Sequence, residues 1–231
     1  MGIAGSGMSA VAEIAKAYGF EVSGCDLKTG GHDVKHLEGV DILAITPAVY
    51  FQSSQHPELV EGQQRGIAMT WQEFMGKYLH KDKLVICVAG AHGKSTTTAL
   101  AGLLLEAAHL DPTVELGATV PLWRANFRIG KGNYFVSEAD EYYHNFLNYR
   151  PQIIILTMIE MDHPEYFNSL DNVVDAYRKF ISNIKPNGVL IYNETIEQFS
   201  ILNSQFPNNF QKIKYSIRDF PKNLQLQVPG N

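Results

Sequence analysis

A glycine-rich segment of the chain combines residue types that could bind a nucleotide. Residues 90–96 read Gly-Ala-His-Gly-Lys-Ser-Thr and follow an apolar run, residues 84–89. Glycines at such a strand-to-helix turn let backbone N–H groups surround phosphate oxygens at the helix N-terminus. Lys94 would offset the charge of the β- and γ-phosphates, and the Ser95 hydroxyl would ligate Mg²⁺. Only the compact form Gly-x-x-Gly-Lys-Ser is present, because Val88 stands where the longer pattern has its first glycine. The segment predicts a phosphate-binding loop rather than a glycine turn with a solvated lysine.

Acidic residues follow a second apolar run. Glu138 ends the predicted strand 133–138, and two further carboxylates, Asp140 and Glu141, come directly after it. Open α/β sheets collect their ligands at the carboxyl ends of strands, so we expect Glu138 to meet the Mg²⁺ held by Ser95. A solvated acidic loop is the alternative interpretation.

A histidine follows a third apolar run. His163 comes shortly after residues 153–158, at the end of another predicted strand. Taken alone, this histidine would be interpreted as a surface residue. Its position beside a second strand end of the same sheet favours a metal ligand instead.

The elements that must position these residues alternate between strands and helices. In the second part of the chain, apolar spacing predicts strands over 84–89, 133–138, 152–158 and 189–192, and helices over 94–109 and from Leu170 to Ile184. In the first part it predicts strands over 1–4, 20–25 and 41–46, and helices over 8–18, 57–65 and 70–78. A further strand is expected over 224–231. The charged break at residues 80–83 is typical of a linker, so two domains are expected, 1–80 and 81–231. This rhythm indicates an α/β fold with a mostly parallel sheet.

Composition excludes several classes of protein. The chain has 231 residues, of which 45% are hydrophobic and 19% charged, which indicates a folded globular protein. The formal net charge is -5 and the cations are scattered, so nucleic acid is not an expected partner. No apolar run approaches the roughly 20 residues of a membrane span, and we expect no membrane association and a cytoplasmic location. Cys25 and Cys87 are expected to be buried thiols rather than a disulfide or catalytic residues.

Taken together, these motifs resemble those of the ATP-dependent Mur ligases of bacterial peptidoglycan synthesis and recycling. The resemblance is to the branch that acts on UDP-N-acetylmuramate, and it covers nearly the whole chain. The matching segments, in family order, are residues 2–9 (Gly-Ile-Ala-Gly-Ser-Gly-Met-Ser), 23–26 (Ser-Gly-Cys-Asp), 90–98, 110–113, 138–141, 162–163, Asn193 and 228–230.

The resemblance implies a fold and a reaction. It implies an N-terminal Rossmann-like UDP-binding domain, followed by a central α/β domain of the P-loop ATPase type. The lactyl carboxylate of UDP-N-acetylmuramate would attack the γ-phosphate of ATP, and an amino acid or short peptide would capture the acyl phosphate. The implied cofactors are ATP and Mg²⁺. The implied catalytic residues are Lys94, Glu138 and His163, and the implied metal ligands are Ser95, Glu138 and His163. The implied nucleotide-binding residues are Gly90, His92, Gly93, Lys94, Ser95, Thr96 and Asn193. The implied residues for the UDP-sugar are Gly5, Gly7, Met8, Ser9 and Asp26.

Departures from the family pattern qualify this interpretation. Ala91 replaces the loop threonine, Ala4 replaces a glycine, and Glu194-Thr195 stand where the family has an acidic pair. The family also has a third domain that helps to hold the incoming amine. We expect this chain to lack it and to be inactive alone.

Other functions are kept as alternatives. Within the ligase class, residues 141–142 and 148–151 look somewhat like those of the recycling ligase that adds a tripeptide, whereas L-alanine is the default acceptor of the branch. A non-catalytic module that binds a nucleotide or UDP-sugar is a second alternative. The first glycine turn with Asp26 also imitates a dinucleotide fingerprint, but a dehydrogenase would leave Gly90 to Ser95 unexplained.

Overall fold

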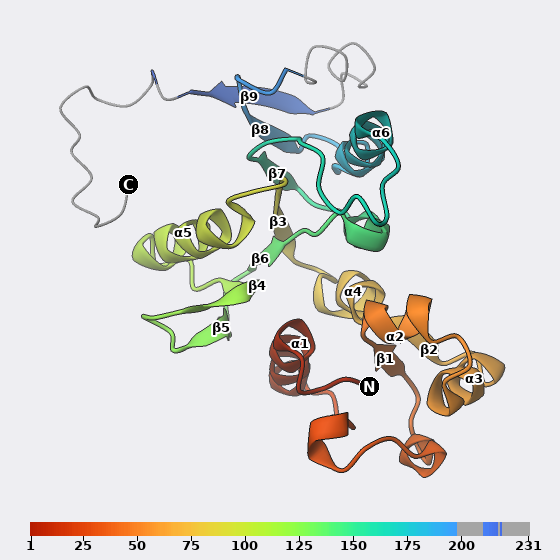
Figure 1. The fold of residues 1–231 in the computed structure, drawn as a ribbon. Coiled ribbons are helices and arrows are strands. Elements are labelled where there is room, and N and C mark those ends of the chain that lie inside the picture. The colour runs from red at the N-terminus through yellow and green to blue at the C-terminus, as the bar shows by residue number, and fades with distance from the viewer. Residues whose placement is uncertain (198–209, 217, 219–231) are drawn as a thin grey trace.

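The chain forms two α/β parts, which the computed structural model describes over residues 1–197, 210–216 and 218 (Figure 1). The helices are α1 (Ser6–Ala17), α2 (Pro47–Gln52), α3 (Pro57–Gln64), α4 (Trp71–Phe74), α5 (Lys94–Ala107) and α6 (Leu170–Ile181). The strands are β1 (Leu43–Ile45), β2 (Ala68–Thr70), β3 (Leu84–Ala89), β4 (Thr113–Val120), β5 (Ala125–Arg128), β6 (Tyr134–Glu138), β7 (Ile153–Leu156), β8 (Val189–Asn193) and β9 (Gln211–Tyr215). Short helical turns cover Leu27–Thr29, Val34–Leu37, Met75–Leu79 and Tyr142–Asn148.

The larger sheet has seven strands in the order β5-β4-β6-β3-β7-β8-β9. All of its pairings are parallel except the β4–β5 pair. Side chains alternate between the two faces of a strand. On β3, Val85, Cys87 and Ala89 join the core on the α6 side, whereas Ile86 packs in the cluster that α5 covers. The sheet is therefore buried on both faces, as parallel sheets require, and the predicted α/β class is confirmed.

The first part contains a two-stranded parallel sheet, β1-β2, with helices α1 to α4 around it. The strands predicted over 1–4 and 20–25 are wrong, because neither segment forms a ladder. The N–H groups of Gly2 and Ile3 both donate to the carbonyl of Cys25, and Gly2 has a left-handed φ of 81°. Met1 donates its amine to the carbonyl of Ala44 at 2.8 Å and accepts from the N–H of Thr46 at 3.3 Å, but the chain turns at Gly2 before a ladder can form.

The two parts share a packed core. Val11 and Ile14 of α1 belong to the same buried cluster as Phe135 of β6. The hydroxyl of Tyr18 donates to Thr113 Oγ1 at 3.0 Å, and the Asn126 side-chain amide donates to the carbonyl of Ser6 at 2.7 Å. The first part is therefore held against the β4–β5 edge of the large sheet.

The junction between the two parts, residues 80–83, differs from the charged linker that its composition predicts, because its first residue is buried. His80 is buried, and its Nε2 lies 2.9 Å from Ser137 Oγ. Its ring packs edge-on against Phe135 and tilted against Tyr149. Burial lowers the pKa of His80 to about 3. The neutral imidazole is a core residue where the first part joins the second.

Most elements of the second part agree with the sequence. Strand β3 has the predicted bounds, and β6, β7, β8, α5 and α6 lie within a few residues of theirs. Ser169 caps α6, its side chain accepting from the N–H of Asn172. Strands β4, β5 and β9 were not predicted, and the strand expected over 224–231 lies outside the described residues. Over the part of the chain that the structure describes, no helix has the length and apolarity to cross a bilayer.

We predict that His80 makes the protein sensitive to acid. In the unfolded chain the pKa of His80 returns to about 6.5. Below that pH the unfolded state therefore binds a proton that the folded state does not bind, which favours unfolding. Stability should fall as the pH drops from about 6.5 toward 3, by about 2 kcal/mol between pH 7 and pH 5. Urea unfolding at both pH values measures the difference, and His80→Gln should remove this contribution. The exposed His109 is the control, since His109→Gln should keep the wild-type pH dependence.

Candidate nucleotide and metal site

The glycine loop joins the end of β3 to the start of α5. Gly90 has a φ of 140°, and a Cβ there would lie 2.0 Å from Thr157 Oγ1. Gly93 is left-handed, with a φ of 80°, at the N-cap of α5. The Thr157 hydroxyl donates to the carbonyl of His92 at 2.7 Å. The backbone path therefore requires glycine, and the segment after β7 supports the loop from one side.

An ion pair joins the loop to the acidic segment after β6. Lys94 Nζ lies 3.2 Å from Glu141 Oε2 and 3.5 Å from Oε1. The Glu141 side chain is buried and that of Lys94 is partly buried, with 1% and 13% of their surfaces exposed. Taking such charges out of water is costly unless they are paired, so Glu141 holds the ammonium group of Lys94 at the N-terminus of α5.

Three potential cation ligands converge beside this ion pair. One ligand atom each from Asp140, Glu141 and His163 lies within 4.8 Å of the other two. Burial, followed by the charge of Glu141, raises the pKa of Asp140 to about 6. Neighbouring carboxylates that oppose each other's ionisation are the arrangement that a divalent cation relieves. The residues present therefore fit a cation with oxygen and imidazole ligands.

Aromatic rings and an unusual backbone surround these ligands. His163 has a φ of 53°, and its ring stacks on Tyr142 at a centroid distance of 4.3 Å. Tyr143 and His144 are also left-handed, with φ of 51° and 57°. The ring of Tyr143 stacks on Phe51 of α2 at 4.5 Å, with an interplanar angle of 12°. Positive φ at three non-glycine residues is uncommon and marks a segment whose shape is imposed by its surroundings.

The other residues predicted for the nucleotide lie at the same edge of the sheet. Ser95 and Thr96 occupy the first turn of α5 and border an open hollow of about 410 Å³ between α5 and the residues 116–122. Glu138 accepts a hydrogen bond from the N–H of Gly117 at 2.9 Å. It is absent from the trio above, and its role as a ligand of Mg²⁺ stays a prediction.

Two further predicted nucleotide contacts lie at the margins. His92 is largely exposed, and its Nε2 is 3.9 Å from Glu160 Oε2. Asn193 ends β8, where its Oδ1 accepts from the N–H and the hydroxyl of Thr195. These contacts do not connect either residue to Lys94. The proposed roles of His92 and Asn193 in binding the nucleotide stay predictions.

The residues predicted for the UDP-sugar surround the N-terminus of α1. Gly5 is its N-cap, and the Asp26 side chain accepts from the N–H groups of Ala4 and Lys28. The backbone bond from Lys28 is the main cause that lowers the pKa of Asp26. A Cβ on Gly7 would lie 2.9 Å from the Trp71 ring.

Met8 and Ser9 complete this predicted set. The Met8 side chain is buried in the protein, and Ser9 Oγ donates to the carbonyl of Ser6 at 2.9 Å. The N–H groups of Gly2 and Ile3 donate to the carbonyl of Cys25, and that of Ala4 donates to Asp26, so the turn is held against residues 25–26. Its function stays a prediction.

The sequence indicates the acidic run 138–141 but not which of its carboxylates contacts Lys94. The pairing of Glu141 with Lys94 joins residues 47 positions apart, and only the adjacency of β3 and β6 brings them together. The run of three carboxylates after a strand was a usable signal for Asp140 and Glu141. Nothing local indicated that the ring of Tyr142 stacks on His163.

A lysine that begins a helix after a glycine loop, at the carboxyl edge of a parallel sheet, defines a fold of the P-loop ATPase type. Comparison with known families identifies which family within this class the chain matches. Residues 88–228 match the Mur ligase middle domain, and residues 1–82 match the model described as Mur ligase family, catalytic domain. The chain belongs to the Mur ligase family.

Individual relatives agree with this family. A UDP-N-acetylmuramate–L-alanine ligase from Caldicellulosiruptor saccharolyticus is 37% identical over 209 residues, covering 84% of this chain and 45% of the relative. One of the same name from Desulfitobacterium hafniense is 35% identical over 219 residues, covering 87% of this chain and 48% of the relative. The chain thus spans about half the length of the curated relatives it matches.

Solved structures show the same fold. The UDP-N-acetylmuramate-alanine ligase MurC from Thermotoga maritima has a TM-score of 0.67 and 25% identity, covering 93% of this chain and 52% of that one. The UDP-N-acetylmuramate:L-alanyl-gamma-D-glutamyl-meso-diaminopimelate ligase from Neisseria meningitides has a TM-score of 0.80 and 24% identity, covering 92% of this chain and 75% of that one.

We predict that Gly90→Ala destabilises the protein and distorts the loop, because the added Cβ would collide with Thr157 and Met158. Gly66 is the matched control, since it also has a positive φ but nothing within 4 Å of an added Cβ. Gly66→Ala should cost about 1 to 2 kcal/mol from backbone strain alone, and Gly90→Ala should cost more. Urea unfolding measures both. Equal losses would contradict the close packing of the loop.

Proposed function

We propose that this chain carries the ATP-binding and UDP-sugar-binding parts of an ADP-forming amide ligase that joins the lactyl carboxylate of UDP-N-acetylmuramate to L-alanine. The observation that carries the proposal is the position of Lys94 at the glycine loop, beside Asp140, Glu141 and His163. The names of the relatives at 35% and 37% identity support the substrate and the acceptor. We assign the UDP-sugar to residues 1–80 and ATP to residues 81–231.

The chemistry requires two anions to approach each other. The lactyl carboxylate attacks the γ-phosphate of ATP, which forms an acyl phosphate and ADP, and the amino group of the acceptor then displaces phosphate. Positive charge must offset the repulsion of the first step and stabilise charge on the transferring phosphoryl group. Lys94 supplies one such charge, and the backbone N–H groups of the glycine loop supply dipoles.

Glu141 would act as a positioning residue. Its buried carboxylate holds the Lys94 ammonium near the loop. Ser95, Asp140, Glu141 and His163 are the residues that would hold Mg²⁺, with Glu138 as the further candidate from the sequence. When bound, the cation supplies electrostatic stabilisation of the phosphate oxygens.

The first part would bind the UDP-sugar at the N-terminus of α1. Its first-turn N–H groups can point at a diphosphate, and Gly5, Gly7 and Ser9 carry no bulky side chain that would block the approach. Met8 would support the turn from the protein interior. Asp26 accepts from the N–H of Ala4, and we assign it the role of fixing the turn that would bind the diphosphate.

L-alanine is the acceptor that we propose, because it is named for the relatives above 30% identity. The likeness to the tripeptide ligase from Neisseria is below 25% identity and supports the fold alone. A non-catalytic binding module is the alternative from another class. Binding without L-alanine-dependent ADP release, in a protein of the full length of the relatives, would favour that alternative.

Thermal unfolding with single ligands tests the proposal. Mg-ATP and UDP-N-acetylmuramate should each raise the unfolding midpoint, because a ligand at about 100 times its Kd stabilises by roughly 2.7 kcal/mol. NAD should have no effect. Stabilisation by NAD alone would overturn the assignment and favour a dinucleotide enzyme.

We predict that Lys94→Ala removes the midpoint shift caused by Mg-ATP and leaves the shift caused by UDP-N-acetylmuramate. The reason is that Lys94 lies at the glycine loop, far along the chain from the turn at α1. The exposed Lys81 is the matched control, and Lys81→Ala should keep both shifts. A full ATP shift in Lys94→Ala would contradict the role of Lys94.

A further inference from the structure

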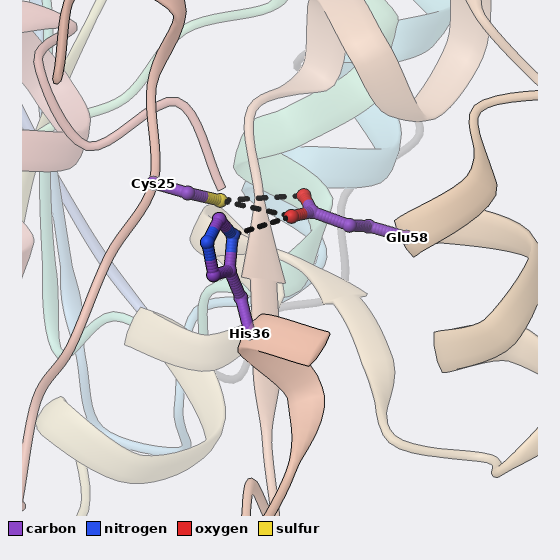
Figure 2. Close-up of side chains that lie close together, drawn as sticks. All are labelled: Cys25, His36 and Glu58. Atoms are coloured by element: carbon purple, nitrogen blue, oxygen red, sulfur yellow. Dashed lines mark hydrogen bonds and ion pairs between the residues drawn. The ribbon is translucent and has the colours of Figure 1, made fainter. Parts of the chain in front are cut away.

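A second group of metal-ligating side chains lies in the first part of the chain, away from the phosphate loop. Cys25, His32, His36, His56 and Glu58 come from two segments, residues 25–36 and the start of α3. Figure 2 shows the thiol of Cys25 and the ring of His36 pointing at the carboxylate of Glu58. Nothing in the proposed ligase reaction uses these side chains.

Three of the five ligand atoms are mutual neighbours. Cys25 Sγ lies 3.2 Å from Glu58 Oε2, and His32 Nδ1 lies 3.2 Å from that oxygen and 3.3 Å from the sulfur. In a tetrahedral zinc site with Zn–N and Zn–O of about 2.0 Å and Zn–S of about 2.3 Å, ligand atoms are about 3.3 to 3.5 Å apart. The three atoms therefore already form one face of such a site.

His36 can supply a fourth ligand. Its Nδ1 is 3.0 Å from Glu58 Oε1, and its ligand atom lies within 4.8 Å of that of Cys25. The His36 side chain is 46% exposed, and its Nδ1 also accepts from the N–H of Asp33 at 3.2 Å. Turning the ring toward the sulfur would exchange that hydrogen bond for a bond to the metal. His56 lies next to the group, its ring edge-on to His32 at 4.9 Å.

The burial of Glu58 is the second reason to look for a cation. The whole residue is 0% exposed, and among the described residues no lysine or arginine forms an ion pair with it. An isolated carboxylate in such a place is costly unless positive charge or several donors compensate it. The N–H of Asp33 donates to Glu58, and two histidines and a thiol also surround its carboxylate. Imidazole, carboxylate and, once its proton leaves, thiolate are the ligands that zinc takes.

We propose that Cys25, His32, His36 and Glu58 form a zinc site that closes the segment 25–36 against the N-terminus of α3. Binding releases the thiol proton and leaves both histidines neutral. All four positions are filled by side chains, which is the arrangement of a structural rather than a catalytic site. The site is chemically distinct from the trio Asp140, Glu141 and His163, which offers oxygen and imidazole but no sulfur.

Zinc content is the first test. The purified chain, stripped of metal and then equilibrated with Zn²⁺ in an excess of Mg²⁺, should retain about one zinc per chain after gel filtration, and zinc should raise its unfolding midpoint. The Mg²⁺ keeps the carboxylate trio occupied. A wild-type chain that retains no zinc overturns the proposal.

Cobalt identifies the ligands. Co²⁺ bound at the proposed site should show a thiolate-to-cobalt charge-transfer band and the strong visible bands of tetrahedral cobalt. Cys25→Ser should lose the charge-transfer band, and Cys87→Ala, which changes the other cysteine, should keep it. Cobalt bound without the band, or with a band that depends on Cys87, places the metal elsewhere and overturns the proposal.

Two variants guard against simple misfolding. His36→Asn changes a partly exposed side chain and should weaken zinc binding by at least about tenfold, because losing a direct ligand should cost no less than losing an outer-shell partner. His109→Asn replaces an exposed histidine that belongs to no group of potential ligands, and it should bind zinc as the wild type does. Equal zinc affinity in His36→Asn and wild type would remove His36 from the site, and the four-ligand proposal with it.

Discussion

The pairing of β3 with both β6 and β7 is the constraint on which the functional edge of this protein depends. All three strands are parallel, and Val88 pairs with Glu138 while Ala89 pairs with Leu156. The segments that follow them therefore leave the sheet at the same level. This is why Lys94 reaches Glu141, and why Thr157 supports the glycine loop. The site is a consequence of strand register, which the burial of β3 on both faces holds in place.

The elements that sequence reasoning predicted are those whose signals are local. Strand β3 is an unbroken apolar run, and α6 has an apolar face and the capping Ser169. Strand β4 escaped prediction because it carries a glycine, two threonines and Glu115, a buried carboxyl whose pKa burial raises well above its usual range. Its place in the sheet comes from pairing with β5 and β6, which no local pattern encodes.

The candidate site was predictable in its residue types and less so in its contacts. Lys94 and the acidic run after β6 could be recognised from the sequence. Glycines mark the loop, and an apolar run followed by carboxylates marks the end of the strand. The sequence favours Glu138 as a metal ligand because it is the last residue of its strand. In the structure its side chain accepts from Gly117 of β4, and the residues beyond the strand, Asp140 and Glu141, converge with His163. The group around Glu58 was not foreseen, since its members lie up to 33 positions apart.

The stack of Phe51 on Tyr143 joins the two parts of the chain through a direct side-chain contact. Phe51 belongs to α2 of the first part, and Tyr143 lies two residues after Glu141, which holds Lys94. A ligand that displaces α2 must either move that turn or break a stacking contact worth about 1 kcal/mol. Such a coupling free energy is reciprocal. If a ligand of the first part changes the affinity of the second part for its own ligand by some factor, the second ligand changes the affinity for the first by the same factor. The final equilibrium is therefore the same whichever ligand binds first.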